Sequence, residues 1–314
     1  MNPKVSIIMA TYNRSHFILE TLVSIENQSY KNFECLIIDD GGIDNTFEII
    51  GPLIEKDQRF KYFKRPDQYV KGLPGSRNYG LDLAKGEYII FFDDDDIVHP
   101  QNLELCIKEL SDTDIYFCRY IRSVFFENFH YNFDYSKEYG SFYIDVKDIE
   151  RMLKNELPFN SCAVMWKALC FENNRFTEHL MYAEEWELYS RILTSGYRGI
   201  SIEKCLFFGR KHPNSNTGEF YRNNQIRVES KQNAILLVVE NLQAKKLLNY
   251  SLMRYFMHLS MAYKKFKLFS KILETSKLNF ITRAKWIVFY NLLPIKILLY
   301  KFRKKLRTNT NYEN

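Results

Sequence analysis

EYIIFFDDDD, residues 87–96, gives the clearest structural signal in this chain of 314 residues. Five apolar or aromatic residues, Tyr88 to Phe92, run directly into four aspartates, Asp93 to Asp96. An apolar run of this length is typical of a strand buried on both faces of a parallel sheet. Ligands bind beyond the carboxyl ends of such strands. Four adjacent carboxylates repel one another, and their oxygens suit a hard divalent ion such as Mg²⁺ or Mn²⁺. A solvated acidic turn is the alternative interpretation of this stretch taken alone.

Two earlier apolar runs also end in polar residues. Residues 5–10 end in Thr11-Tyr12-Asn13-Arg14, and residues 35–38 end in Asp39-Asp40-Gly41-Gly42. Segments with helical spacing separate these runs, and a short strand is expected near residues 60–63. The alternation predicts a parallel α/β sheet with right-handed crossovers. Polar groups at three strand ends would then converge on one edge of the sheet and line a cleft.

The rest of the chain is less regular. Residues 115–143 are aromatic and predict further strands of a mixed sheet. YAEEWELYSRILTSGYR (182–198) predicts a helix with Glu184 and Glu185 in its first turn, where the helix dipole by itself favours acids. Residues 209–224 are polar and predict a loop that could act as a lid. Beyond Gln225 the spacing is helical.

Composition places the chain among globular proteins. Hydrophobic residues make up 46% of it, with 25 Phe and 22 Tyr, which is enough for a sizeable core. Six cysteines without a Cys-x-x-Cys pair indicate reduced thiols in a cytosolic protein. The first fourteen residues read as a strand and not as a signal peptide. Residues 243–307 hold 16 basic residues and one acid, so a basic tail region follows an acidic body.

The tail ends in WIVFYNLLPIKILLYKFRKKLR, residues 286–307. Its apolar part, 286–300, is too short and too polar to cross a bilayer, which takes about 20 apolar residues. Aromatic and aliphatic residues followed by five basic ones in 301–307 suit a segment that lies on an anionic membrane surface. A core-packing helix with a solvated basic end is the alternative. No nucleic-acid-binding motif accompanies the charge, so no nucleic-acid partner is expected.

Taken in order, these motifs resemble the family 2 glycosyltransferases, which are nucleotide-sugar-dependent enzymes with the GT-A fold. VSIIMATYNR is similar to the family's first strand, and IIDDGGIDNT to its Val-Asp-Asp-Gly-Ser-Thr-Asp-x-Thr turn, with Gly42 in place of Ser. GLPGSRNYGLDLAKGEYIIFFDDDD resembles the Ala-Arg-Asn-x-Gly helix and the Asp-x-Asp strand. AEEWELYSRILTSGYR resembles the Glu-Asp motif of the acceptor side.

The resemblance covers roughly residues 4–225 and implies a fold. We expect a GT-A-like, Rossmann-type mixed α/β sheet flanked by helices over residues 1–225. Its nucleotide-binding half would be 1–110 and its acceptor half 111–225. A basic, helical C-terminal extension, which could associate with membranes, would occupy 226–314.

The resemblance also implies roles on the donor side. Tyr12 would stack on a uracil ring, and the backbone near Ala10 would hold the base. Asp40 would accept a hydrogen bond from the uracil N3–H, which favours uridine. Arg77 would reach the ribose or the diphosphate, and Arg14 would belong to the same donor site.

A metal site and a catalytic base are implied as well. Asp93 and Asp95 form the Asp-x-Asp pair, in which Asp95 would bind Mn²⁺ or Mg²⁺. Asp93 or Asp94 would hold the ribose and the waters of the metal. His212, in GRKHPNS, could complete the metal shell.

The family's base is the Asp of its Glu-Asp motif, a position that Glu185 occupies here. Glu is one methylene longer than Asp, which is a departure from the pattern. Glu184 would orient the acceptor or the base. Glu185 would deprotonate the acceptor hydroxyl, and a single displacement would invert the anomeric configuration.

The implied function is transfer of a sugar from a UDP-sugar to a lipid-linked saccharide, at the cytoplasmic face of the membrane, in bacterial surface polysaccharide synthesis. Two alternatives belong to other classes. A nucleotidyltransferase would carry a Gly- and Lys-rich phosphate loop after its first strand, and residues 11–14 are not one. A non-catalytic carbohydrate-binding relic would have lost the Asp-x-Asp pair or the base.

Overall fold

The computed structural model divides into two compact units, Met1–Val238 and Val239–Asn314. The division lies inside helix α8 (Gln225–Ala244), whereas the sequence predicted a boundary after residue 225. The difference has a packing reason, because Ala234 of α8 is fully buried against Leu180 and Ala183 of the first unit. The structure describes residues 4–130, 132–136, 138–212, 216–262 and 266–310.

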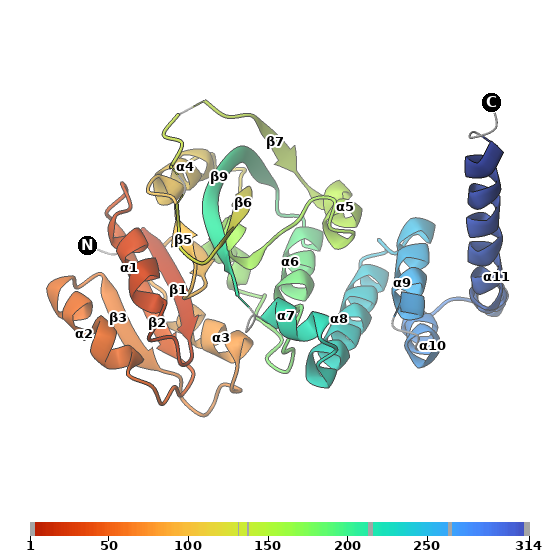
Figure 1. The fold of residues 1–314 in the computed structure, drawn as a ribbon, viewed down its shortest axis with the longest axis horizontal. Coiled ribbons are helices and arrows are strands. Elements are labelled where there is room, and N and C mark those ends of the chain that lie inside the picture. Colours follow the sequence, from red (N-terminus) through yellow and green to blue (C-terminus); the bar gives the residue numbers. More distant parts are fainter. Residues whose placement is uncertain (1–3, 131, 137, 213–215, 263–265, 311–314) are drawn as a thin grey trace. The chain divides into compact units, whose positions relative to one another are not determined.

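The first unit is built on a mixed sheet (Figure 1). Over the described residues the strand order is β3-β2-β1-β4-β8-β6-β9-β5, and β7 pairs with β9. The strands are β1 (Val5–Thr11), β2 (Phe33–Asp39), β3 (Phe60–Lys64), β4 (Tyr88–Phe92), β5 (Ile97–Val98), β6 (Phe117–Phe126), β7 (Ser141–Ile144), β8 (Val164–Lys167) and β9 (Gly199–Lys211). The helices of this unit that precede α8 are α1 (Ile18–Glu26), α2 (Thr46–Lys56), α3 (Leu73–Leu83), α4 (Asn102–Leu110), α5 (Ile149–Leu153), α6 (Glu184–Thr194) and α7 (Asn216–Tyr221). The predicted GT-A-like α/β arrangement is confirmed.

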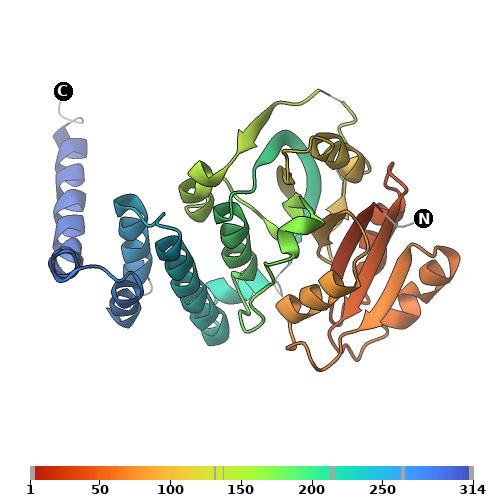
Figure 2. The same ribbon diagram turned by 180° about the vertical axis from the view of Figure 1, so that it is seen from behind.

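Strands β1 to β4 form the parallel half of the sheet, with β1 between β2 and β4. Every residue of β2 and β4 is buried, as their continuous apolar runs predict. Helices α1 and α3 lie on opposite faces of these strands, which the front and back views show (Figures 1 and 2). Gly80 lets α3 approach β1 closely, because a Cβ there would lie 2.4 Å from a methyl carbon of Ile8.

The strand register brings the polar strand ends together. Thr11 of β1 pairs with Asp39 of β2, and Met9 of β1 pairs with Phe92 of β4. The residues that follow these strands therefore leave the sheet at the same edge. This edge is where the sequence predicted a cleft.

Strand β9 occupies a region that the sequence predicted differently. Residues 209–211 belong to this strand and residues 216–221 to α7, so the predicted polar loop over 209–224 is wrong for these positions. Residues 213–215 lie outside the described residues. Residues 209–211 extend the strand because they pair with β6, where Phe125 lies opposite Arg210, and because the Arg210 N–H donates to Asp96 (2.7 Å). Tertiary pairing outweighs the polar local sequence.

The second unit contains α9 (Tyr250–Ala262), α10 (Phe266–Thr275) and α11 (Phe280–Thr310). One side of α11 is packed: the Tyr290 ring stacks on that of Phe269, with centroids 4.1 Å apart, and Trp286 is buried. The other side carries exposed apolar residues, including Val288 (57% exposed) and Ile295 (55%). The side chains of the predicted basic cluster, 301–307, lie outside the described ones. Among the described helices, none is long and apolar enough to cross a membrane.

Candidate active site

A cavity of about 560 Å³ opens at the polar edge of the parallel strands. It brings together nearly all of the predicted site residues, although they come from segments more than a hundred positions apart. Those that line it are Ala10, Tyr12, Arg14, Asp40, Asp93, Asp94, Asp95, Glu184, Glu185 and His212. Arg77 is the one predicted site residue that does not line it.

Asp40 is held at the end of β2 by three donors. Its Oδ1 accepts hydrogen bonds from Arg65 Nε (2.6 Å), the Gly72 N–H (3.0 Å) and the Ser76 hydroxyl (3.2 Å). All three bonds use the same oxygen, so Oδ2 keeps its capacity to accept from a ligand in the cavity. The sequence analysis missed Arg65. Arg65 directly follows β3, as Asp40 follows β2. Its place at the end of a parallel strand was the signal that could have identified it.

Tyr12, which the sequence predicted to bind the donor, is an exposed aromatic residue of the cavity. It is 46% exposed, and the Lys71 ammonium lies 4.8 Å from the centroid of its ring. The next residue, Asn13, has a left-handed backbone (φ 54°), and its side-chain oxygen accepts from the Ile43 N–H (2.8 Å). This bond joins the turn after β1 to the turn after β2. The two turns that carry Tyr12 and Asp40 are therefore fixed to each other.

Arg14 faces two of the aspartates. Its Nε lies 3.3 Å from Asp94 Oδ1, and its Nη2 lies 4.0 Å from Asp95 Oδ2. Burial raises the pKa of Asp94 to about 7, Arg14 opposes the rise, and the carboxylates of Asp95 and Asp93 add to it. The guanidinium of Arg14 therefore only partly offsets the burial of Asp94 and the charge of its neighbours.

Asp95 and His212 lie together, as the sequence predicted. The His212 Nε2 is 2.7 Å from Asp95 Oδ2, and strand β9 brings the histidine to this position. The carboxylates of Asp93, Asp94 and Asp95 crowd one strand end, so a cation there would relieve their repulsion. An oxygen-rich set of this kind fits Mn²⁺ or Mg²⁺.

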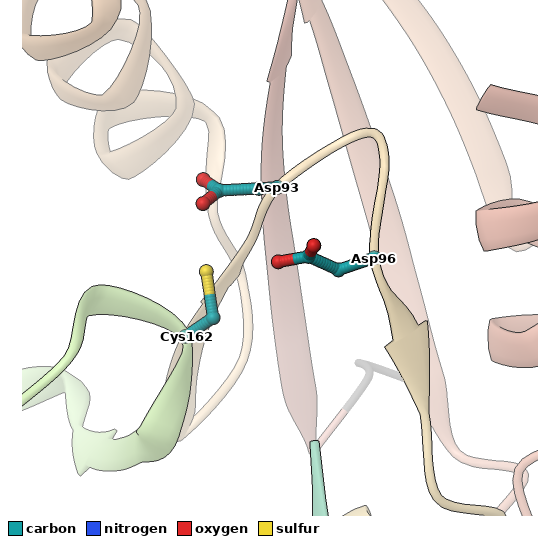
Figure 3. Close-up of side chains that lie close together, drawn as sticks. All are labelled: Asp93, Asp96 and Cys162. Carbon is teal, nitrogen blue, oxygen red and sulfur yellow. The ribbon is translucent and has the colours of Figure 1, made fainter. Parts of the chain in front are cut away.

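Asp93 lies in a different group from Asp95 and His212. Ligand atoms of Asp93, Asp96 and Cys162 all lie within 4.8 Å of one another, and their side chains converge in the close-up (Figure 3). Burial raises the pKa of the Cys162 thiol well above its ordinary value, so the sulfur keeps its proton. A protonated thiol is a poor ligand for a hard ion. The three predicted metal ligands are thus divided between two neighbouring groups.

Arg77 lies below the cavity wall and joins its two sides. Its guanidinium donates to Asp93 Oδ1 (2.9 Å) and to Glu185 Oε1 (3.0 Å), and the residue is 1% exposed. The rings of Phe91 and Phe176 lie on it, each with its centroid 5.5 Å from the guanidinium carbon. This position differs from the predicted contact with the ribose or diphosphate, because carboxylates engage both terminal nitrogens.

The three glutamates in the first turn of α6 have separate environments. Glu187 is 2% exposed and pairs with Arg191 (2.5 Å), so it is structural. Burial raises the pKa of Glu184 to about 8, with a further contribution from Glu185, so the Glu184 carboxyl is protonated at neutral pH. Glu185 is partly exposed to the cavity and pairs with Arg77. The helix thus presents one neutral acid and one ion-paired carboxylate to the same space.

Two cations of α8, Arg227 and Lys231, also line the cavity. The sequence analysis missed both, because they lie beyond residue 225, where the motifs end. Two cations spaced by one helical turn do not by themselves indicate a functional site. Only the packing of α8 on the first unit reveals them.

The model of the glycosyl transferase family 2 matches residues 6–170, more than half of the chain. The chain belongs to glycosyl transferase family 2. Within the family, it is 46% identical over 92 residues to an Escherichia coli protein named UDP-Glc:alpha-D-GlcNAc-diphosphoundecaprenol beta-1,3-glucosyltransferase WfaP. The match covers 29% of this chain and 35% of that one. The chain likewise spans about a third of the length of other curated relatives that it matches.

Two solved structures share the fold of this family 2 chain. TarS (residues 1–349) from S. aureus in complex with UDP-GlcNAc has a TM-score of 0.63 at 18% identity, covering 87% of this chain and 79% of that one. The mannosyltransferase PcManGT from Pyrobaculum calidifontis, in complex with GDP-Man and Mn²⁺, has a TM-score of 0.57 at 15% identity. That match covers 98% of this chain and 84% of the other. At these identities the likeness concerns the fold alone.

Proposed function

We propose that this family 2 chain is an inverting, metal-dependent glycosyltransferase that uses a UDP-sugar as its donor. The acceptor is a hydroxyl of a lipid-linked saccharide, and the work is done at the inner face of the cell membrane, in surface polysaccharide synthesis. One observation carries the proposal: a single cavity is lined by Asp40 and the aspartates after β4 on one side and by Glu185 on the other. The uridine and the diphosphate of the donor would then lie in the same cavity as the catalytic base.

Uridine selection rests on Asp40 and Tyr12. Asp40 Oδ2 would accept the uracil N3–H, while Oδ1 stays bonded to its three donors. The exposed ring of Tyr12 offers a face for the planar base. The fold does not fix the nucleotide, because TarS is in complex with UDP-GlcNAc and PcManGT with GDP-Man, so the uridine assignment rests on Asp40 and Tyr12.

The metal would be held by Asp95 and His212. When bound, Mn²⁺ or Mg²⁺ would neutralise the negative charge that develops on the diphosphate leaving group. Arg14 holds Asp94 and Asp95 in place from the cavity side. The complex of PcManGT with Mn²⁺ shows only that a protein of this fold can carry such an ion, so the assignment rests on Asp95 and His212.

Glu185 would act as the general base. Its carboxylate would take the proton of the acceptor hydroxyl while the hydroxyl oxygen attacks the anomeric carbon and the bond to UDP breaks. Arg77 orients Glu185 through the bond to Oε1 (3.0 Å). Glu184, protonated at neutral pH, could donate a hydrogen bond to the acceptor. One displacement of this kind inverts the configuration.

Membrane association rests on α11. Its exposed apolar side, which includes Val288 and Ile295, would lie in the interface, and the charge of the five basic residues in 301–307 would add attraction to anionic lipid. The WfaP relative, whose name specifies a diphosphoundecaprenol-linked acceptor, supports a lipid-linked substrate.

The direct test is a screen of UDP-, GDP- and dTDP-sugars for nucleotide release by the purified full chain with Mn²⁺ or Mg²⁺. We expect UDP release from at least one UDP-sugar, lost with a chelator and in Asp95→Ala. Glu172→Gln, an exposed glutamate outside the cavity, serves as the control and should behave as wild type. Turnover of a GDP- or dTDP-sugar at a comparable rate would overturn the uridine assignment.

A further inference from the structure

Helix α8 completes the acceptor side of the cavity. The Tyr182 N–H donates to the Ser230 hydroxyl oxygen (2.9 Å), and this hydroxyl donates to the Tyr182 carbonyl (2.8 Å). The Arg227 guanidinium donates to the Met181 carbonyl. These bonds fix the start of α8 to the segment that leads into α6. Side chains from this part of α8 therefore have set positions beside the catalytic glutamates.

Lys231 is the residue of α8 best suited to bind a ligand. It is half-buried, it lines the cavity, and its ammonium lies 3.8 Å from the centroid of the Trp186 ring. The ring itself is anchored, because Trp186 Nε1–H donates to the Leu153 carbonyl (3.2 Å). A cation over an anchored indole is held in place without losing its charge.

The neighbouring charged groups have contact partners or are neutralised, whereas Lys231 has no ion-pair contact of its own. Arg227 pairs with Glu219 (3.0 Å), Glu185 pairs with Arg77, and Glu184 carries a proton at neutral pH. Within the described part of the chain, Lys231 forms no ion pair. Burial lowers the pKa of Lys231 to about 8, and the nearby carboxyl groups of Glu185 and Glu184 oppose the fall, so the amine is still mostly charged at pH 7. A partly buried charge without a contacting partner is costly, and an anionic ligand would supply that contact.

We propose that Lys231 is the anion-binding residue of an acceptor subsite, and that it binds a negatively charged group carried by the acceptor saccharide beside the hydroxyl that Glu185 deprotonates. The inference rests on the proposed glycosyltransferase function and narrows its acceptor. The ligand chemistry is an anionic oxygen group attached to a sugar. A phosphate or diphosphate ester at the anomeric carbon and a uronate carboxylate both provide it.

Binding calorimetry on the full chain, preloaded with UDP and Mn²⁺ to fill the donor site, tests the proposal. Three soluble probes distinguish a diphosphate ester from a uronate and from a neutral sugar. They are N-acetylglucosamine α-linked to a diphosphate with a short alkyl chain, methyl glucuronide, and neutral methyl N-acetylglucosaminide. We expect one anionic probe to bind more tightly than the neutral one. Lys231→Met should weaken that binding roughly 10- to 100-fold, the value of a hydrogen bond to a charged group, and leave the neutral probe unchanged. Lys231→Arg should retain most of the affinity.

Lys108→Met is the matched control. Its ammonium also lies over an aromatic ring, 5.4 Å from the Tyr139 centroid, but outside the cavity, so all three affinities should stay as in wild type. Equal affinity of wild type for all probes, or an equal loss for charged and neutral probes in Lys231→Met, would overturn the proposal. Failure of UDP to bind in the preloading step would count against the proposed function instead, so the two failures are distinguishable.

Discussion

The donor side and the acceptor side of the cavity are built in different ways. On the proposed donor side, Tyr12, Asp40 and the aspartates after β4 lie within a few residues of parallel strand ends, and the register of those strands brings them together. On the proposed acceptor side, the groups come from α6 and α8. Long-range side-chain contacts hold them, such as those between Arg77 and Glu185 and between Ser230 and Tyr182. Substitution of Asp40 should change the affinity for the donor, and substitution of Glu185 should change the rate of transfer.

The largest effect is expected for Glu185→Gln. The amide keeps the shape but cannot take the acceptor proton, so transfer should fall roughly 10²- to 10⁴-fold, the usual weight of general-base catalysis. UDP affinity should stay unchanged, which separates the two sides of the cavity. Steady-state transfer rates and calorimetry with UDP provide the measurement. If Glu184→Gln showed this loss and Glu185→Gln did not, the base would have to be reassigned.

Asp40→Asn tests the donor side through the same two quantities, the affinity for UDP and the transfer rate. The substitution removes the charge that both Arg65 and the uracil N3–H use, so the Kd for UDP should rise roughly 10- to 100-fold. At saturating donor, the transfer rate should change far less than in Glu185→Gln. An unchanged Kd for UDP, together with wild-type preference for uridine, would remove Asp40 from the donor site.

Glu184→Gln should change the pH dependence of stability. The pKa of Glu184 is raised from 4.5 to about 8 by burial, so over this interval the folded state holds a proton that the unfolded state has lost. The free energy of unfolding therefore falls as pH rises from 5 to 8, by roughly 1 kcal/mol per pH unit from this group. Denaturant unfolding at pH 5, 6.5 and 8 should show a flatter profile for Glu184→Gln than for wild type. Parallel profiles would mean that Glu184 ionises normally.

The smallest effect concerns α11. Val288→Glu with Ile295→Glu places two charges on the exposed apolar side and should reduce co-sedimentation with anionic liposomes several-fold, while high salt releases only part of the wild type. Leu19→Glu with Val23→Glu, the same change on exposed positions of α1, is the matched control (43% and 41% exposed). Wild-type chain that stays in the supernatant at low salt would refute the membrane assignment.

The sequence predicted the parallel strands and their polar ends well, for a physical reason. A strand buried on both faces must be continuously apolar, so β4 was recognised at its observed bounds, and the polar residues after it marked the cleft. Helix α6 was predicted from its apolar stripe for a similar reason. In both cases the pattern that forms the element also carries the functional residues.

The rest of the cavity could not be predicted to the same extent, because its contacts are not local. β9 ends in Arg210 and Lys211, which read as a loop until their pairing with β6 and the bond to Asp96 are known. Lys231 follows no motif, and its role appears only once α8 packs beside Trp186. The burial of Arg77 between two aromatic rings and two carboxylates is likewise a property of the assembled fold.

The central claim is that one metal-dependent site holds the uridine diphosphate of the donor at the ends of β2 and β4. Calorimetric titration of UDP into the full chain, with Mn²⁺ and then with a chelator, tests it most directly. We expect binding with Mn²⁺ and a loss of affinity on the order of 100-fold with the chelator, with the same loss in Asp95→Ala. Equally tight binding of UDP with and without Mn²⁺ would contradict the account.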